Sequence, residues 1–132
     1  LTYRLYNCNI LICVYKYMEV GIMQVTELFK AMSDETRLRI IHLIFQHDLC
    51  VCELVEILEE SQPKISKHIA KLRQIDLVTT QRNEQYIYYS FNHQNSSYVK
   101  IISNMIEEIR NIDVYKKDLE RLQAIETFVC SN

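Results

Sequence analysis

The apolar residues of this chain follow a helical spacing everywhere except in one short region. From residue 25 to about residue 75, apolar side chains recur every three or four positions, as they do along amphipathic helices. The runs 77–81 and 85–91 are instead rich in β-branched and aromatic residues, which predicts a two-stranded hairpin. Helical spacing returns from about residue 97 to residue 128. We therefore expect a mainly α (α+β) fold with one small β-hairpin.

Composition supports a helical chain and excludes several classes of protein. The 132 residues contain one glycine and one proline, which argues against a turn-rich sandwich or barrel. The net charge is −2, so any contact with nucleic acid would depend on a local basic patch. We find no glycine-rich phosphate loop and no HExxH zinc motif, so we expect no enzymatic activity.

Capping signals divide the first helical region into separate helices. Ser33 is the expected N-cap of a helix over about 34–46, and a tight turn leads to a helix over 50–60. Ser61 is the expected N-cap of the next helix, which has Pro63 in its first turn. Two short helices joined by a tight turn and followed by a hairpin predict a winged helix-turn-helix.

The chain is expected to have three parts. Residues 1–22 form an N-terminal arm, 23–96 a winged helix-turn-helix DNA-binding domain, and 97–132 one or two C-terminal dimerisation helices. A less regular segment at 113–117 leaves open whether the last part is continuous. The apolar stripe of residues 97–132 has no obvious partner within the chain, so we expect it to pack against a second copy of the protein. The expected dimer contacts are Ile102, Met105, Ile109 and Ile112.

The helix that begins at Ser61 is the expected DNA-reading element. In helix-turn-helix proteins the second helix of the pair enters the major groove, with its N-terminal residues nearest the bases. Three lysines of this helix, Lys64, Lys67 and Lys71, lie on the same side of it. Such a charged side can also be an ordinary solvated surface. The residues expected to contact DNA are Gln62, Lys64, Ser66, Lys67, His68 and Lys71, together with Arg82 at the hairpin tip. A two-fold protein would read an imperfect palindrome.

The cysteines indicate a reducing compartment. The chain has five, an odd number, without a convincing export signal, so we expect a cytoplasmic protein with reduced thiols rather than a disulfide framework. The first eighteen residues are apolar but interrupted by Asn7, Asn9 and Lys16, and we expect no membrane partner. Translation starting at Met18 or Met23 is an alternative.

Two cysteines separated by one residue, Cys50 and Cys52, lie at the expected start of a helix. Each could simply be a small core residue. A helix N-terminus, however, lowers a thiol pKa, and thiolates select soft ions. Side chains two positions apart on an ideal helix point to opposite sides. One ion could therefore hold both sulfurs only if this turn were distorted or not yet helical.

The stretches "DETRLRIIHLI", "DLCVCELVEIL" and "SQPKISKHIAKLRQIDLV" resemble the ArsR/SmtB family of metal- and metalloid-responsive repressors. The resemblance covers roughly residues 25–92. It implies a homodimer that binds operator DNA and releases it when an inducer binds Cys50 and Cys52. The implied inducer is As(III) or Sb(III), or alternatively Cd(II) or Pb(II), and no permanent cofactor is implied.

The chain departs from the family pattern in its third ligand. The arsenic sensors of the family have a third thiol where this chain has Val55, and the cadmium/lead branch draws cysteines from an N-terminal arm. Cys8 and Cys13 are possible additional ligands, and Cys130 is another. Two other functions stay open. One is a thiol-based redox or persulfide-sensing repressor, for which Cys50 and Cys52 are expected to be badly placed. The other is a regulator without a ligand.

Overall fold

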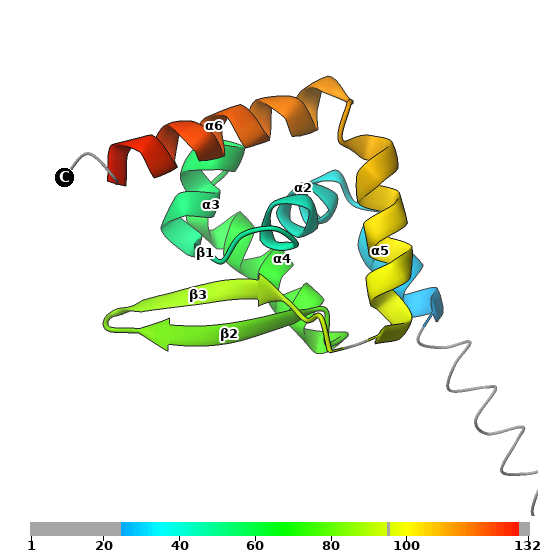
Figure 1. Cartoon of the computed structure of the whole chain (residues 1–132). Coiled ribbons are helices and arrows are strands. Elements are labelled where there is room, and N and C mark those ends of the chain that lie inside the picture. The colour runs from blue at the N-terminus through cyan, green and yellow to red at the C-terminus, as the bar shows by residue number, and fades with distance from the viewer. Residues whose placement is uncertain (1–24, 95, 130–132) are drawn as a thin grey trace, which may run out of the picture.

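The computed structural model describes residues 25–94 and 96–129. After a helix over residues 25–32, the elements are α2 (Glu35–Ile44), β1 (Leu49–Cys50), α3 (Val51–Leu58), α4 (Gln62–Gln74), β2 (Val78–Asn83), β3 (Tyr86–Phe91), α5 (Ser96–Ile109) and α6 (Asp113–Val129). In Figure 1 the hairpin lies at the bottom, while α5 and α6 border two other sides of a bundle centred on α2. This order of elements is that of a winged helix.

Along residues 25–94 and 96–129, no helix combines the length and the apolar character needed to cross a membrane.

The sheet has three strands rather than the two expected. β3 lies in the middle and pairs antiparallel with β2 on one side and with the two-residue strand β1 on the other. Arg82 and Asn83 belong to β2, so the hairpin turn is shorter than expected. Glu84 occupies the turn with a positive φ of 54°, a conformation that usually favours glycine. We missed β1 because two residues are too short to show any periodicity.

The helix starts follow local capping chemistry. Asp34, and not Ser33, is the N-cap of α2, since its side chain accepts a hydrogen bond from the Arg37 backbone N–H at 3.0 Å. The Ser33 hydroxyl donates instead to the Lys30 carbonyl oxygen of the preceding helix. Ser61 is the N-cap of α4 as expected, with Pro63 in the first turn.

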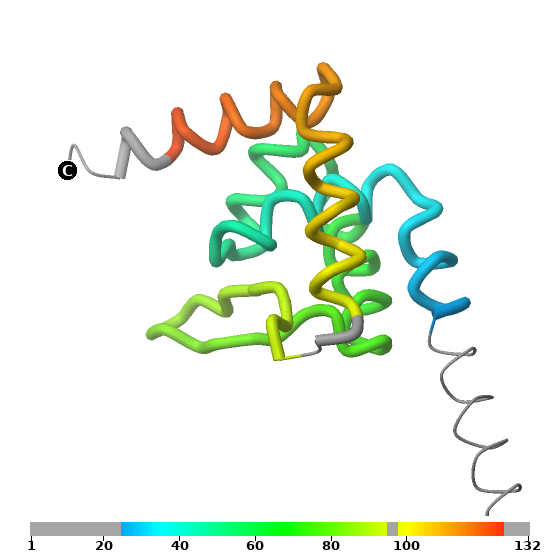
Figure 2. Tube along the Cα trace, turned by 45° about the vertical axis from the view of Figure 1, so that its right-hand side comes forward, coloured from blue at the N-terminus to red at the C-terminus, as the bar shows by residue number. Residues whose placement is uncertain are grey.

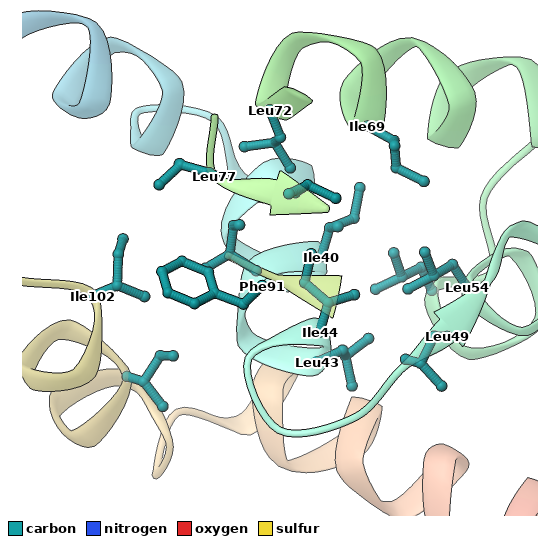
Figure 3. Packing of buried hydrophobic residues seen from close by; sticks show 14 of the residues in the cluster. Ile40, Leu43, Ile44, Leu49, Leu54, Ile69, Leu72, Leu77, Phe91 and Ile102 are labelled. Atoms are coloured by element: carbon teal, nitrogen blue, oxygen red, sulfur yellow. The ribbon is translucent and has the colours of Figure 1, made fainter. Parts of the chain in front are cut away.

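The core is built around α2. Ile40, Ile41 and Leu43 have no exposed surface, because α2 is covered by other elements on several sides. Figure 3 shows apolar side chains from the other elements converging on this helix. They include Leu49, Leu54, Ile69, Leu72, Leu77, Phe91 and Ile102. One continuous core therefore joins the helix-turn-helix, the base of the hairpin and α5.

The C-terminal helical region is two helices that meet at a bend, as Figure 2 shows between the yellow-orange and orange-red segments. The break at residues 110–112 lies just before the less regular segment seen in the sequence. Ile102 is wholly buried in the core of its own protomer, so our assignment of this residue to a dimer contact was wrong. Met105 and Ile109 are partly buried, whereas Ile112 is 51% exposed. α5 thus contributes to the protomer core as well as to the surface.

Candidate soft-ion site and nucleic-acid interface

The two cysteine sulfurs lie side by side. Cys50 is the N-cap of α3 and has an extended backbone, with φ −84° and ψ 168°, whereas Cys52 is in the first turn. Because Cys50 precedes the helix, its side chain does not follow the helical rotation, and the two Sγ atoms are 3.0 Å apart. Residue 50 is not yet helical, which is one of the two conditions under which one ion was expected to reach both sulfurs, so the pair does not depend on unwinding the helix to meet. The expectation that the two thiols are badly placed for a mutual disulfide was wrong.

The surroundings of Cys50 favour the neutral thiol. The pKa of the Cys50 thiol is raised to about 12, chiefly because the side chain is buried and secondly because it shares a hydrogen bond with Cys52. The backbone N–H of Cys50 donates to Glu53 Oε2 at 2.8 Å, which closes a capping box. We had expected the helix start to lower the pKa of this thiol, and burial outweighs that effect. An ion that binds both sulfurs as thiolates must displace protons.

The donor set consists of two sulfurs. Within the part of the chain that the structure describes, no group of three or more His, Cys, Asp or Glu side chains could hold a metal ion. Two adjacent thiols fit a soft, thiophilic ion, and they fit a hard oxygen-seeking ion poorly. The other candidate ligands, Cys8, Cys13 and Cys130, lie outside the described residues.

The exposed face of α4 carries most of the residues expected to contact DNA. Gln62, Ser66, Lys67 and Lys71 are exposed on this face. Lys64 is also exposed, and its Nζ lies 2.6 Å from Glu60 Oε1. This ion pair offsets part of the positive charge at the N-terminal end of the helix. Arg82 is exposed in β2 and its Nε donates to the Glu84 carbonyl oxygen at 3.2 Å.

His68 has a structural position instead of an exposed one. It is only 9% exposed, and its Nδ1 lies 3.4 Å from Arg37 Nη1 and 3.6 Å from Asp34 Oδ1. The pKa of His68 is lowered because the ring is buried, although the Asp34 carboxylate acts in the opposite direction. Little of the ring is left to contact DNA, contrary to the expectation that His68 lies at the edge of the exposed lysine flank. His68 instead fixes α4 against the start of α2.

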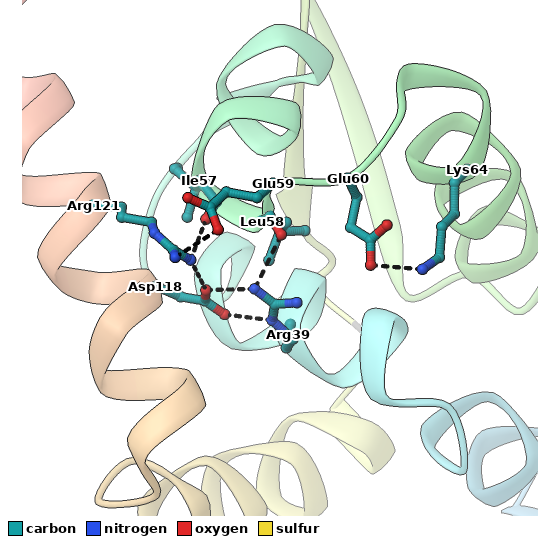
Figure 4. A network of polar contacts seen from close by, with 8 residues as sticks. All are labelled: Arg39, Ile57, Leu58, Glu59, Glu60, Lys64, Asp118 and Arg121. Carbon is teal, nitrogen blue, oxygen red and sulfur yellow. Dashed lines mark hydrogen bonds and ion pairs between the residues drawn. The ribbon is translucent and has the colours of Figure 1, made fainter.

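A polar cluster holds the far end of α3, opposite the thiol pair (Figure 4). Arg39 of α2 donates to the Leu58 carbonyl oxygen at 3.2 Å, and Arg121 of α6 donates to the Ile57 carbonyl oxygen at 3.1 Å. Asp118, which is fully buried, binds both arginines. These guanidinium groups satisfy carbonyl groups that a helix C-terminus leaves without intrahelical partners. The C-terminal end of α3 is thus tied to both α2 and α6.

Sequence reasoning missed two features of the thiol site. The first is the pairing of β1 with β3, which had no detectable signal in so short a segment. The second is Glu53, whose carboxylate binds the Cys50 backbone. An acidic residue three positions after a cap residue is a capping-box pattern, so the spacing of Cys50 and Glu53 could have revealed it.

The fold and the exposed basic helix define a class: this is a winged helix-turn-helix protein of the DNA-binding regulator type. Residues 34–80 match the sequence profile of the bacterial regulatory protein, arsR family. The chain is 36% identical over 101 residues to the arsenical resistance operon repressor of Escherichia coli K12, covering 75% of this chain and 79% of that protein. The chain belongs to the ArsR family.

Two further comparisons agree with this assignment. The arsenic resistance transcriptional regulator ArsR2 of Pseudomonas putida is 46% identical over 74 residues, which is 55% of this chain and 64% of that relative. The chain thus spans somewhat less than two thirds of that protein. The solved structure of reduced HlyU from Vibrio cholerae superposes with a TM-score of 0.60 at 32% identity, covering 74% of this chain and 97% of HlyU. The expected fold is confirmed.

Proposed function

We propose that this protein is a homodimeric transcriptional repressor that leaves its operator DNA when a soft ion binds Cys50 and Cys52. The observation that carries the proposal is the 3.0 Å separation of the two sulfurs at the start of α3. That helix is followed within a few residues by α4, the proposed DNA-reading helix. A change at the thiol pair would therefore act on α3, the helix that directly precedes the proposed DNA-reading helix.

The proposed inducer is As(III) or Sb(III), with Cd(II) or Pb(II) as alternatives. The relatives support the first choice, since two of them are named for arsenic or arsenical resistance. The chemistry of the donors supports the whole group, because thiolates bind soft ions in preference to hard ones. Two thiolates leave a trivalent ion one ligand short, so we propose that Cys8, Cys13, Cys130 or a non-protein ligand completes the site.

In the DNA complex, α4 is proposed to enter the major groove and the hairpin to contact the flanking backbone. Lys67 and Lys71 would bind phosphates, and Gln62 and Ser66 would approach base edges. Arg82 would reach a phosphate or the minor groove from the hairpin. Pairing of two protomers through α5 and α6 would place two such units on an imperfect palindrome.

The proposal is tested by titrating the reduced, full-length protein with arsenite. Thiolate charge-transfer absorption reports ion binding, and release from an operator fragment selected from a random DNA library reports function. Cys50→Ser and Cys52→Ser should each bind the operator but respond to arsenite much less than the wild type. Val51→Ala, which keeps both thiols, is the matched control and should respond normally. Release of the double variant at the wild-type arsenite concentration would refute the sensing role.

A second candidate function is redox sensing, and the same sulfur separation favours it. A hydroperoxide could oxidise the two thiols to a disulfide, with loss of two electrons and two protons, while the peroxide is reduced to an alcohol and water. Mass spectrometry would detect the loss of two hydrogens after peroxide treatment. Operator release that accompanies this loss, and that a reductant reverses, would favour this function over ion sensing.

A further inference from the structure

Cys50 belongs to two structural elements at once. It is the N-cap of α3, and it is also the last residue of β1, where it pairs with Tyr88 of β3 while Leu49 pairs with Tyr89. A residue that carries one of the two sulfurs is thus part of the same sheet as the hairpin. The wing is the hairpin formed by β2 and β3. We infer that ion binding at the thiol pair is transmitted to the wing through β1, so that the conformation of the wing, and not only that of α4, changes when the ion binds. This inference rests on the proposed function and specifies its regulation.

The point at which β1 meets β3 lies between the base and the tip of the wing. At the base, Phe91 is buried and its ring centroid lies 4.9 Å from that of Phe45. Toward the tip, Tyr86 is 44% exposed, so the core does not hold this end. β1 contacts β3 at Tyr88 and Tyr89, between these two points. Figure 1 shows β1 beside β3 at the start of α3. β1 therefore supports the wing at one point between its base and its tip.

The β1 contact is also the weaker of the two ladders of the sheet. β2 and β3 are joined over six residue pairs, whereas β1 and β3 are joined over two. A side-chain hydrogen bond adds to this short ladder, because the Ser90 hydroxyl donates to the Asp48 carboxylate just before β1. A small displacement of Cys50 is thus enough to disturb the pairing, while the hairpin itself stays intact.

Binding of one ion requires the two sulfurs to move apart. Two thiolates held at about 2.3 Å lie about 3.3–3.8 Å from each other, the shorter value for a pyramidal trivalent ion such as As(III) and the longer one for a tetrahedral ion. The present separation is 3.0 Å. Cys52 is inside α3, whose far end is held by Arg39 and Arg121 through the carbonyl oxygens of Leu58 and Ile57. Cys50 is buried and precedes the helix, whereas Cys52 is exposed, so the part of the displacement that the Cys52 side chain does not take up falls on Cys50 and hence on its pairing with Tyr88.

The inference is tested with reduced, full-length protein and arsenite as the probe. Hydrogen exchange is followed by mass spectrometry in parallel with thiolate absorption and operator release. We expect residues 86–91 to exchange faster once the ion is bound, while residues 113–129 of α6 keep their rate. Ion binding and operator release with unchanged exchange in 86–91 would overturn the inference alone. Absence of thiolate absorption would overturn both the proposed function and the inference that depends on it.

Variants of the Asp48–Ser90 contact provide a second measurement. The ratio of operator affinities without and with arsenite should be on the order of 5- to 150-fold for the wild type, the usual range of allosteric coupling. Ser90→Ala and Asp48→Asn loosen the wing before the ion binds, so the ratio should fall toward one while arsenite still binds. Thr79→Ala is the matched control, since Thr79 donates to the Ser90 carbonyl oxygen from the β2 side. An unchanged ratio in Ser90→Ala and Asp48→Asn would contradict transmission through β1.

Discussion

Asp118 of α6 binds Arg39 of α2 through two contacts, 2.8 Å to Nε and 2.7 Å to Nη2, although 79 positions separate the two residues. Asp118 has no exposed surface, and it also lies 3.4 Å from Arg121. The carboxylate therefore joins the C-terminal helix to α2, and its arginine partners join it to the end of α3. A buried ion pair of this kind is costly to break, because the remaining charge keeps its desolvation cost without its partner.

We predict that Asp118→Asn lowers the free energy of unfolding by about 3–5 kcal/mol, the usual cost of removing one member of a buried pair. Urea denaturation followed by circular dichroism measures the change. Glu107→Gln is the matched control, since Glu107 pairs with Arg110 on the surface, where both side chains are more than half exposed. It should change stability little. Equal effects of the two substitutions would contradict the importance of the buried pair.

His42 should make the protein less stable as the solution becomes acidic. The ring is fully buried, packs edge-on against Tyr115 at 5.3 Å, and has no hydrogen-bond partner among the described residues. Burial lowers the pKa of His42 below its usual value of 6.5, although Asp118 acts in the opposite direction. Below pH 6.5 the unfolded chain binds more protons at this residue than the folded chain, so stability falls until the folded-state pKa is reached.

The measurement is the free energy of unfolding between pH 7.5 and pH 5, expressed as a slope against pH. His42→Phe keeps an aromatic ring against Tyr115 and should make this slope shallower. His47→Gln removes a histidine outside the core as the control. An identical slope in wild type and His42→Phe would show that His42 does not cause the acid sensitivity.

The lysines of α4 should differ in their effect on operator binding. Lys67→Ala and Lys71→Ala should weaken binding, and each should lower the slope of log affinity against log salt by about one if it removes a phosphate contact. Lys64→Ala should have a smaller effect, because Lys64 is already paired with Glu60. Fluorescence anisotropy at several salt concentrations gives the slopes. Lys117→Ala on α6 is the control, and unchanged affinity in all three α4 variants would exclude this helix as the DNA-reading element.

The exposed end of α5 and the bend that follows should lie in the proposed dimer contact. Ile112 is 51% exposed, so Ile112→Glu places a charge there without disturbing the protomer core. We expect this variant to sediment as a monomer in analytical ultracentrifugation and to bind the operator weakly. Gln46→Glu adds the same charge at an exposed position in the turn after α2 and serves as the control. A folded Ile112→Glu dimer with normal DNA binding would place the interface elsewhere.

The main helices and the wing were predictable because their signals are local. Periodic burial along α2 and α4 follows from spacing within each helix, and Pro63 marks a helix start by its own covalent geometry. The alternating run that became β3 was equally clear. His68 shows where such reasoning failed. Its angular position on α4 suggested the exposed lysine flank, but Asp34 and Arg37 from another helix lie over it.

The sequence by itself determined that this is a helical chain with a wing, a basic helix after a tight turn, and a thiol pair before that helix. Only the tertiary structure decided how these parts relate. The sulfur separation of 3.0 Å depends on α3 starting at Val51 and not one residue earlier, which leaves Cys50 extended and paired with β3. Likewise, Asp118 is buried because α2 and α3 surround it. Such relationships arise between residues distant along the chain, where periodicity and spacing carry no information.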